Sequence, residues 1–254
     1  MRAAEISHVV HLGDCLDPVS GLASLPDRSV DHVITDPPYE AEAHTKQRRV
    51  RRSAGVLEFA PLSFPPITED QRIAVAAHFG RIARRWVVVF CQVEAIHLWS
   101  DALEAGGLTV RRVGVWVKPD GMPQFSGDRP GMGYESIVIA HQPGRSRWNG
   151  GGKRGVWIVP QMGAAQTRTG HQTQKPLALM EALVRDFTDP GEVVLDPFAG
   201  SGTTGVACKR LGRGFIGWER DPKYHSIAER RIREAREQLE IGMAFTKAKQ
   251  ETLL

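Results

Sequence analysis

Short apolar runs rich in β-branched residues alternate with stretches of helical periodicity along most of the chain. The strand-like runs occupy residues 9–12, 30–35, 86–91, 110–117, 136–140, 193–195 and 215–218. Helix-like stretches, such as Thr68 to Arg84 and Leu177 to Phe187, lie between several of them. Strands that alternate with helices indicate βαβ units. The pattern therefore predicts an α/β protein with a mostly parallel sheet covered by helices on both faces.

Two segments depart from this regularity. Residues 40–66 are basic and then rich in proline, and residues 119–170 combine many glycines and arginines with only two short strand-like runs, at 136–140 and 156–159. Loops of this length in a compact domain are usually functional or disordered. We therefore expect one domain over residues 1–254, with a mobile basic loop at 40–66 and an inserted region at 119–170. A final helix from Pro222 to about Leu239 has a stripe of core residues.

Length and composition exclude several classes of protein. A chain of 254 residues accommodates one sizeable α/β domain but is short for two. No apolar run approaches the roughly 20 residues that span a bilayer, and no secretory signal is visible. Cys15, Cys91 and Cys208 are too far apart for a Cys-x-x-Cys pair. We therefore expect a cytoplasmic protein with no zinc site, other metal site, disulfide framework or membrane segment.

The small net charge of +4 is compatible with a nucleic acid partner but does not establish one. Each of the two irregular segments contains a cluster of positive side chains. Each cluster is read either as a solvated loop or as a set of contacts to phosphates. The candidate DNA-binding residues are Lys46, Arg48, Arg49, Arg51, Arg52, Arg145, Arg147, Lys153 and Arg154.

The first motif with chemical content is the run from Val33 to Tyr39, in which an apolar strand ends in Asp-Pro-Pro-Tyr. Successive prolines cannot continue a sheet ladder, so the chain leaves the strand in a rigid turn at its carboxyl end, where open α/β sheets bind ligands. A carboxylate and a carbonyl beside an aromatic ring suit a planar group that bears an NH2. The candidate catalytic residues are Asp36, Pro37, Pro38 and Tyr39.

The second motif runs from Val193 to Gly205 and contains Gly-x-Gly-x-x-Gly between a strand and a helix. The next strand-like run, 215–218, is followed by Glu219, which is suitably placed to bind ribose hydroxyls. Alone, this pattern fits a nicotinamide or flavin enzyme equally well. Its position near the C-terminus, the preceding Asp-Pro-Phe and the second functional turn at Asp36 favour a group-transfer reaction from an adenosyl cofactor.

With both motifs in view, the chain resembles the DNA amino-methyltransferases, specifically the β-order group in which Asp-Pro-Pro-Tyr precedes the cofactor loop. The resemblance spans most of the chain and also includes Leu12 to Cys15, His171 to Pro176 and Gly212 to Glu219. It implies a Rossmann-like class I methyltransferase fold with a seven-stranded sheet, and S-adenosylmethionine as cofactor. The cofactor-binding residues implied in this way are Asp14, Cys15, Lys175, Pro176, Asp196, Phe198, Gly200, Ser201, Gly202, Thr203 and Glu219.

The resemblance further implies that a base is flipped out of DNA and methylated on its exocyclic amino group. Asp in the first position of the motif favours adenine N6, with cytosine N4 as the alternative; RNA and protein amides are less favoured substrates. The alternatives of another class are an NAD-dependent oxidoreductase and a catalytically silent DNA-binding module. The family also allows a homodimer, although no feature of this sequence indicates one. A cognate nuclease in a restriction–modification system is left open.

Overall fold

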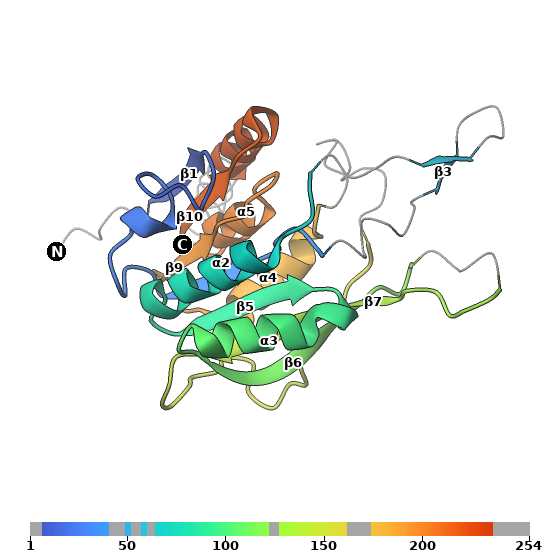
Figure 1. Cartoon of the computed structure of the whole chain (residues 1–254), viewed down its shortest axis with the longest axis horizontal. Helices are drawn as coiled ribbons and strands as arrows, with labels where there is room; N and C mark the ends of the chain where they lie inside the picture. The colour runs from blue at the N-terminus through green and yellow to red at the C-terminus, as the bar shows by residue number, and fades with distance from the viewer. Residues whose placement is uncertain are drawn as a thin grey trace, which may run out of the picture.

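The computed structural model describes residues 7–40, 49–51, 57–59, 64–121, 127–161 and 174–235. Its centre is an eight-stranded sheet (Figure 1). From one edge to the other, the strands are β1 (His8–Leu12), β10 (Gly214–Glu219), β9 (Val193–Asp196), β2 (His32–Thr35), β5 (Trp86–Cys91), β7 (Tyr134–His141), β6 (Thr109–Val117) and β8 (Val156–Ile158). Only β7 runs antiparallel to its neighbours. This arrangement confirms the mostly parallel α/β sheet.

The expected number of seven strands is wrong by one. The additional strand is β8, which lies within the region expected to be an irregular insertion and pairs in parallel with β6 at the edge of the sheet. Backbone hydrogen bonds from Val115 N to Gly155 O and from Val159 N to Val117 O extend this pairing at both ends. The sequence marked 156–159 as a strand-like run, but three residues give too short an alternation to show that the run joins the main sheet.

Helices cover both faces of the sheet, as expected. α2 (Glu69–Ile82) and α3 (Ile96–Ala105) pack on one face, and α4 (Leu177–Phe187), α5 (Thr203–Arg210) and helix 222–235 pack on the other. Alternate residues of the fully buried β5 divide between the two cores: Val87 and Val89 face α2 and α3, whereas Val88 and Phe90 face α4 and α5. This alternation is the period of a strand buried on both sides.

The sequence carries clear boundaries for the helices. Thr68 accepts a hydrogen bond from Gln71 N and its own N–H donates to Gln71 Oε1, which forms a capping box at the start of α2. Pro176 caps α4 at the position where the helical pattern begins. Two short 3-10 helices, η1 (Leu22–Ser24) and η2 (Val93–Ala95), complete the connections. Among the described residues, no helix has the length and apolar character needed to cross a membrane.

Residues 40–66 were expected to form a loop, but they contain two short antiparallel strands, β3 (Arg49–Arg51) and β4 (Leu57–Phe59). This pair is separate from the main sheet. In Figure 1, β3 and the chain that leads into β7 both project on the side where the parallel strands end. The mobility of this segment stays a prediction.

Candidate active site

The functional side chains follow one another along a single rim of the sheet, at the carboxyl ends of its parallel strands. Asp14 follows β1, Glu219 ends β10, Asp196 ends β9 and Asp36 follows β2. The rim continues past β5 to Glu135, which lies at this end because β7 runs in the opposite direction. The two sequence motifs therefore lie on neighbouring strands of one rim.

A direct hydrogen bond joins the two motifs. Thr35, the last residue of β2, donates from Oγ1 to Oδ1 of Asp196, the last residue of β9, at 2.7 Å. β2 and β9 are adjacent parallel strands, with Val33 opposite Leu195. The Asp-Pro-Pro-Tyr turn and the glycine loop are thus held beside each other by strand pairing and by a buried side-chain contact.

Asp36 lies in a cluster of charged groups that come from distant parts of the sequence. Its Oδ2 accepts a hydrogen bond from Lys175 Nζ at 2.5 Å. Lys175 Nζ also lies 3.2 Å from Oε2 of Glu135, and the other oxygen of Glu135 accepts a hydrogen bond from Lys118 Nζ at 2.5 Å. Tyr39 OH donates to Glu135 Oε2 at 2.7 Å. The charged groups thus follow one another in the order Asp36, Lys175, Glu135 and Lys118, so that carboxylates and ammonium groups alternate.

Burial and charge shift the pKa values of this cluster in different directions. Burial raises the pKa of Asp36, and the nearby Lys175 opposes part of that rise. Burial alone would also raise the pKa of Glu135, but Lys175 and Lys118 together lower it to about 2. Burial raises the pKa of Tyr39 well above its usual value, so the phenol stays protonated and can donate to Glu135.

One oxygen of the catalytic candidate is left without a partner. Asp36 Oδ1 is buried and has no hydrogen-bond donor among the described residues. A buried carboxylate oxygen with no donor costs free energy, and a ligand N–H placed there would remove that cost. The turn is therefore suited to accept a hydrogen from a bound polar group.

The glycine loop that follows β9 has a conformation that requires glycine at two positions. Gly200 and Gly202 have φ angles of +53° and +78°. A Cβ atom on Gly202 would lie 2.8 Å from Cβ of Ala228 in helix 222–235. Gly202 is therefore required by the packing of the loop against a helix, a role that the nucleotide-binding pattern does not reveal.

Asp196 supports this loop from below. Its side chain is buried, Oδ1 accepts from Thr35 Oγ1 and from Phe198 N, and Oδ2 accepts from Thr204 Oγ1 at 2.6 Å. Burial raises its pKa to about 6, although these donors oppose the rise. Both oxygens are thus occupied by contacts within the protein. The geometry makes Asp196 a brace for the loop, whereas the sequence suggested a direct contact to the cofactor.

Glu219 and Asp14 lie side by side beyond the glycine loop. Glu219 is opposite Leu12 in the β1–β10 ladder, and Gly13 N donates to the Glu219 backbone oxygen at 3.0 Å. The Glu219 side chain is partly exposed and the Asp14 side chain is exposed. Cys15, which follows, is buried, and burial raises its thiol pKa to about 12. The accessible carboxylates, and not the thiol, are available to a ligand.

The remaining predicted cofactor residues differ in exposure. Phe198 and Gly200 are partly exposed, whereas the Ser201 and Thr203 side chains are buried. The Ser201 hydroxyl donates to Gln174 Oε1 at 3.1 Å, and Arg231 of helix 222–235 donates to the Ser201 and Thr203 hydroxyls. Pro176 is buried at the start of α4. Of these residues, Phe198 and Gly200 are the ones that leave part of their surface exposed.

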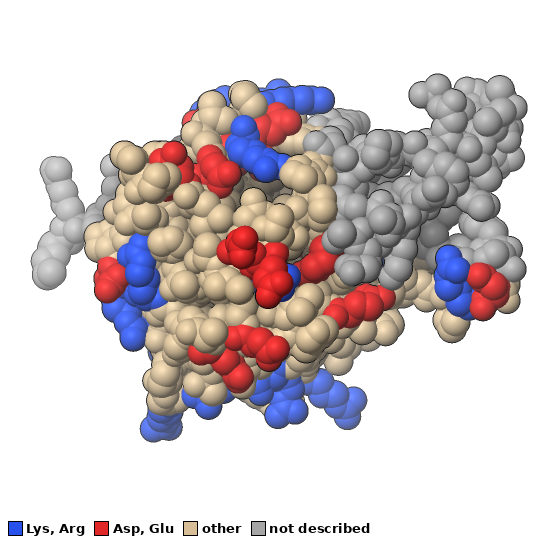
Figure 2. Space-filling model, viewed as in Figure 1, with Lys and Arg blue, Asp and Glu red and all other residues tan. Residues whose placement is uncertain are grey.

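The two basic clusters predicted to bind DNA lie in different places. Arg49 and Arg51 belong to β3, and Lys46, Arg48 and Arg52 lie outside the described residues. The second cluster, Arg145, Arg147, Lys153 and Arg154, lies between β7 and β8. Since β7 runs antiparallel, this loop is at the opposite rim of the sheet from Asp36. Figure 2 shows Lys and Arg gathered along the lower edge of the molecule, where Figure 1 draws β6 and this loop.

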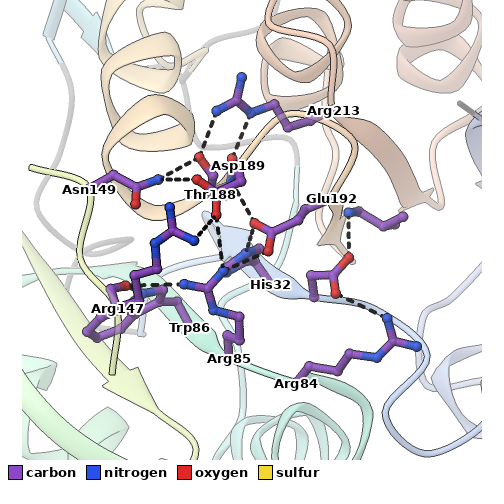
Figure 3. Close-up of polar contacts among 12 residues, drawn as sticks. His32, Arg84, Arg85, Trp86, Arg147, Asn149, Thr188, Asp189, Glu192 and Arg213 are labelled. Carbon is purple, nitrogen blue, oxygen red and sulfur yellow. Dashed lines mark hydrogen bonds and ion pairs between the residues drawn. The ribbon is translucent and has the colours of Figure 1, made fainter. Parts of the chain in front are cut away.

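Part of this second cluster has a structural role. Figure 3 shows Arg147 and Arg85 directed towards Asp189 and Glu192, in the turn before β9. Lys153 pairs with the buried carboxylate of Asp186 at 2.7 Å. These contacts tie the loop to the turn between α4 and β9. Lys153 and Arg147 therefore stabilise the rim at the amino ends of the parallel strands, which we call the amino rim. They do not lie near the Asp36 turn, which is on the carboxyl rim.

Sequence inspection missed Glu135, Lys118 and Arg231. Glu135 immediately precedes a predicted strand, and Lys118 follows another. A polar residue next to a strand is only a weak signal, because its rim depends on the direction of the strand. Among the described residues, no group of three His, Cys, Asp or Glu side chains is arranged to hold a metal ion.

Comparison with known proteins gives consistent matches. Residues 30–230 match the DNA methylase family. The chain is 28% identical over 251 residues to the type II methyltransferase M.HinfI of Haemophilus influenzae, which covers 87% of this chain and 67% of that protein. The solved complex of M1.HpyAVI with SAM has a TM-score of 0.66 at 28% identity, covering 88% and 98% of the two chains. The cytosine-N4-specific PvuII DNA methyltransferase has a TM-score of 0.68 at 17% identity, covering 89% and 86%, and shares the fold.

Proposed function

Because the chain belongs to the DNA methylase family of N6 and N4 amino-methyltransferases, we propose that it methylates the exocyclic amino nitrogen of adenine in DNA. Its fold is that of the class I methyltransferases, and S-adenosylmethionine is the cofactor of such enzymes. One observation carries the proposal: the Asp36 turn and the glycine loop end adjacent parallel strands and are joined through Thr35 and Asp196. A methyl donor and an amino acceptor bound at these two turns would be neighbours.

The residues at the β1, β10 and β9 ends fit S-adenosylmethionine. Accessible carboxylates at Glu219 and Asp14 suit the hydroxyl and amino groups of an adenosine, and the partly exposed ring of Phe198 suits its base. The backbone of Gly200 leaves room for close approach. When bound, the cofactor supplies an electrophilic methyl group on a sulfonium sulfur.

The Asp36 turn is proposed to bind and orient the substrate amine. Oδ1 of Asp36 accepts one amino hydrogen, the Pro37 carbonyl accepts the other, and Tyr39 stacks on the base. Pro38 keeps the turn rigid. Two acceptors favour a pyramidal nitrogen with a localised lone pair, which a conjugated amine otherwise lacks. Asp36 is then the nearest base for the proton that the nitrogen loses, so catalysis depends chiefly on positioning and electrostatics.

DNA is proposed to lie along the carboxyl rim of one catalytic domain, with the target base swung out of the helix. The basic 40–66 segment supports this orientation, since Arg49 and Arg51 belong to a strand pair that projects on this side. The chain that enters β7 projects there too and carries Arg129. We therefore assign DNA contacts to these parts of the two irregular segments, and not to the loop between β7 and β8.

Adenine is favoured over cytosine by the Asp in the first position of the Pro-Pro turn. Both bases present the same two amino hydrogens, so this preference comes from the family pattern and not from geometry. The test is to incubate the protein with duplex DNA and labelled S-adenosylmethionine and to identify the methylated nucleoside by mass spectrometry. N6-methyladenine is expected. N4-methylcytosine would show that the substrate base is cytosine and not adenine. Absence of any methylated nucleoside would refute the proposed function.

Two substitutions test the proposed roles separately. Asp36→Ala should abolish methylation while leaving the dissociation constant for S-adenosylmethionine close to that of the wild type. Glu219→Ala should raise that dissociation constant first, because the carboxylate lies at the cofactor end of the rim. Calorimetric titration with the cofactor and a methylation assay measure both properties. Full activity of Asp36→Ala, or unchanged cofactor affinity of Glu219→Ala, would remove that residue from the site.

A further inference from the structure

Glu135, near the start of β7, connects the Asp36 turn to two lysines from other parts of the chain. One of its oxygens contacts both Tyr39 OH, at 2.7 Å, and Lys175 Nζ, at 3.2 Å, and the other accepts from Lys118 Nζ at 2.5 Å. Its side chain is 17% exposed and that of Lys175 is 9% exposed. The contacts of both residues are therefore made largely away from water, where they hold their geometry firmly.

Lys175 has a different environment from the one expected for a residue that contacts the methionine part of the cofactor. Its ammonium group lies between Asp36 Oδ2 and Glu135 Oε2, and 5.4 Å and 5.0 Å from the ring centroids of Tyr39 and Phe90. Its position between two carboxylates and over two rings surrounds the charge with partners. These partners belong to the side of the rim that is proposed to bind the base.

We propose that Lys175 and Glu135 are positioning residues for the substrate amine. Lys175 holds one oxygen of Asp36, so that only Oδ1 remains to accept the amine hydrogen. Glu135 holds Lys175 and, through the phenol hydroxyl, the ring of Tyr39. The inference rests on the proposed methyl transfer and deepens it, because it names the groups that fix the acceptor and the stacking ring at the same time.

The arrangement of charges explains why both residues are needed. A buried Asp36 without a cation would tend to bind a proton and lose its ability to accept a hydrogen. Without the carboxylate of Glu135, Tyr39 would lose the charged acceptor of its hydroxyl group, and Lys175 would be held only by its hydrogen bond to Asp36. The ammonium of Lys118 balances the second carboxylate. With Asp36 ionised, the two carboxylates and the two ammonium groups of the cluster carry no net charge, and Lys175 fixes one oxygen of Asp36.

This arrangement makes the pH dependence of the reaction diagnostic. Ionisation of Asp36 is required, so the rate should fall as pH falls through its pKa. This fall is the acidic limb of the pH–rate profile. Removal of Lys175 should move the limb to higher pH, and removal of the Glu135 charge should move it to lower pH. The charged and titratable groups that face Asp36 from the surrounding elements are Lys175, Glu135, Lys118, Tyr39, Cys91 and Asp196.

The experiment uses the full chain, S-adenosylmethionine and a duplex that the wild type methylates. Lys175→Met, Lys175→Arg and Glu135→Gln are compared with the wild type in single-turnover methylation between about pH 5 and 8, the range in which proteins tend to be most stable. Lys175→Met should lose about 100-fold in rate, the scale of a misplaced reacting group, with unchanged cofactor affinity. Lys175→Arg should restore part of the rate and return the acidic limb towards that of the wild type.

Lys153→Met is the matched control, because it breaks another lysine–carboxylate pair, with Asp186 on the opposite rim. Its acidic limb should coincide with that of the wild type. Opposite displacements in Lys175→Met and Glu135→Gln would support the proposal. A wild-type limb in both variants would overturn it, as would a Lys175→Met protein with weakened cofactor binding and a normal rate at saturation.

Failure of the proposed function would look different, since the wild type itself would then transfer no methyl group to DNA. Cofactor titration and circular dichroism verify that each variant is folded. Should Lys175→Met not fold, Glu135→Gln still decides the question, because it preserves the shape of the side chain and removes only its charge. An unmoved limb in Glu135→Gln overturns the proposal, and a limb at lower pH supports it.

Discussion

Gly202 lies in the loop expected to hold the cofactor, but its contacts predict that a substitution there will act on folding first. The residue has a φ angle of +78°, and a Cβ atom would lie 2.8 Å from Ala228 Cβ and 2.9 Å from Ala228 Cα. Both neighbours belong to helix 222–235, and one is a backbone atom that cannot rotate away. Gly202→Ala should therefore destabilise the protein even in the absence of any ligand.

The size of the effect follows from two contributions. An alanine in the left-handed region costs about 1–2 kcal/mol, and forcing an additional methyl group into a packed site costs about 1–3 kcal/mol. Gly202→Ala should thus lower the free energy of unfolding by about 2–5 kcal/mol. Gly212 provides the matched control, since its φ angle is +72° and an added Cβ would meet nothing within 4 Å. Gly212→Ala should lose only the first contribution, about 1–2 kcal/mol.

Urea denaturation of the two variants and the wild type, without cofactor, measures both free energies of unfolding. The greater loss should be in Gly202→Ala. If the two variants are equally stable, the close contact with Ala228 does not contribute, and the reasoning is wrong. If Gly202→Ala weakens cofactor binding while its free energy of unfolding matches the wild type, the glycine is required by the ligand and not by the helix.

Two further predictions concern charges on opposite sides of the molecule. Glu192 pairs with the buried His32 and with Arg85, and these contacts lower its pKa from 4.5 to about 2, although burial alone would raise it. A lowered pKa stabilises the fold at pH values above the pKa of the unfolded chain. Stability should therefore be lost as pH falls from about 5 to 2, by about 3 kcal/mol at most and by less where solvent screens the ion pairs. Urea denaturation at pH 6 and pH 3 should show a smaller difference for Glu192→Gln than for the wild type, and equal differences would contradict the assignment. The double variant Arg145→Ala/Arg154→Ala, on the amino rim, should leave DNA affinity within about twofold of the wild type. The double variant Arg49→Ala/Arg51→Ala should weaken DNA binding and reduce the slope of log affinity against log salt by about 2. Fluorescence anisotropy over a range of salt concentrations tests this contrast, which would fail if the amino-rim pair had the larger effect.

The fold could be predicted largely from sequence because its signals are local. α4 has the same limits as the predicted helix, since Pro176 begins the helical pattern and Thr188 follows its last buried residue, Phe187. β5 is an apolar run of strand length, buried on both sides. β8 coincides with the strand-like run expected at 156–159, but its place in the main sheet follows only from its pairing with β6, because Val156 and Ile158 are exposed.

The site was less predictable, since its residues act through contacts that no motif encodes. The glycine pattern correctly located a loop beside the Asp36 turn. It did not show that Ser201 and Thr203 face Arg231, or that Asp196 is enclosed by Thr35 and Thr204. A consensus pattern shows which residues a loop needs, but not whether each is needed for the ligand or for packing. That difference can be seen only when the positions of the neighbouring helix and strands are known.

The direction of β7 explains why Glu135 lies near Asp36 and why the basic cluster at 145–154 lies on the opposite rim. Had β7 run parallel to its neighbours, Glu135 would begin at the amino rim and the arginines after His141 would follow its carboxyl end, beside Asp36. Because β7 is antiparallel, the two ends are exchanged: Glu135 joins Lys175 and Tyr39, and Arg147 joins Asp189 on the opposite rim. Alternating hydrophobicity is the same in either direction. The charges at the two ends of a strand can therefore be assigned to a site only after its pairing is known.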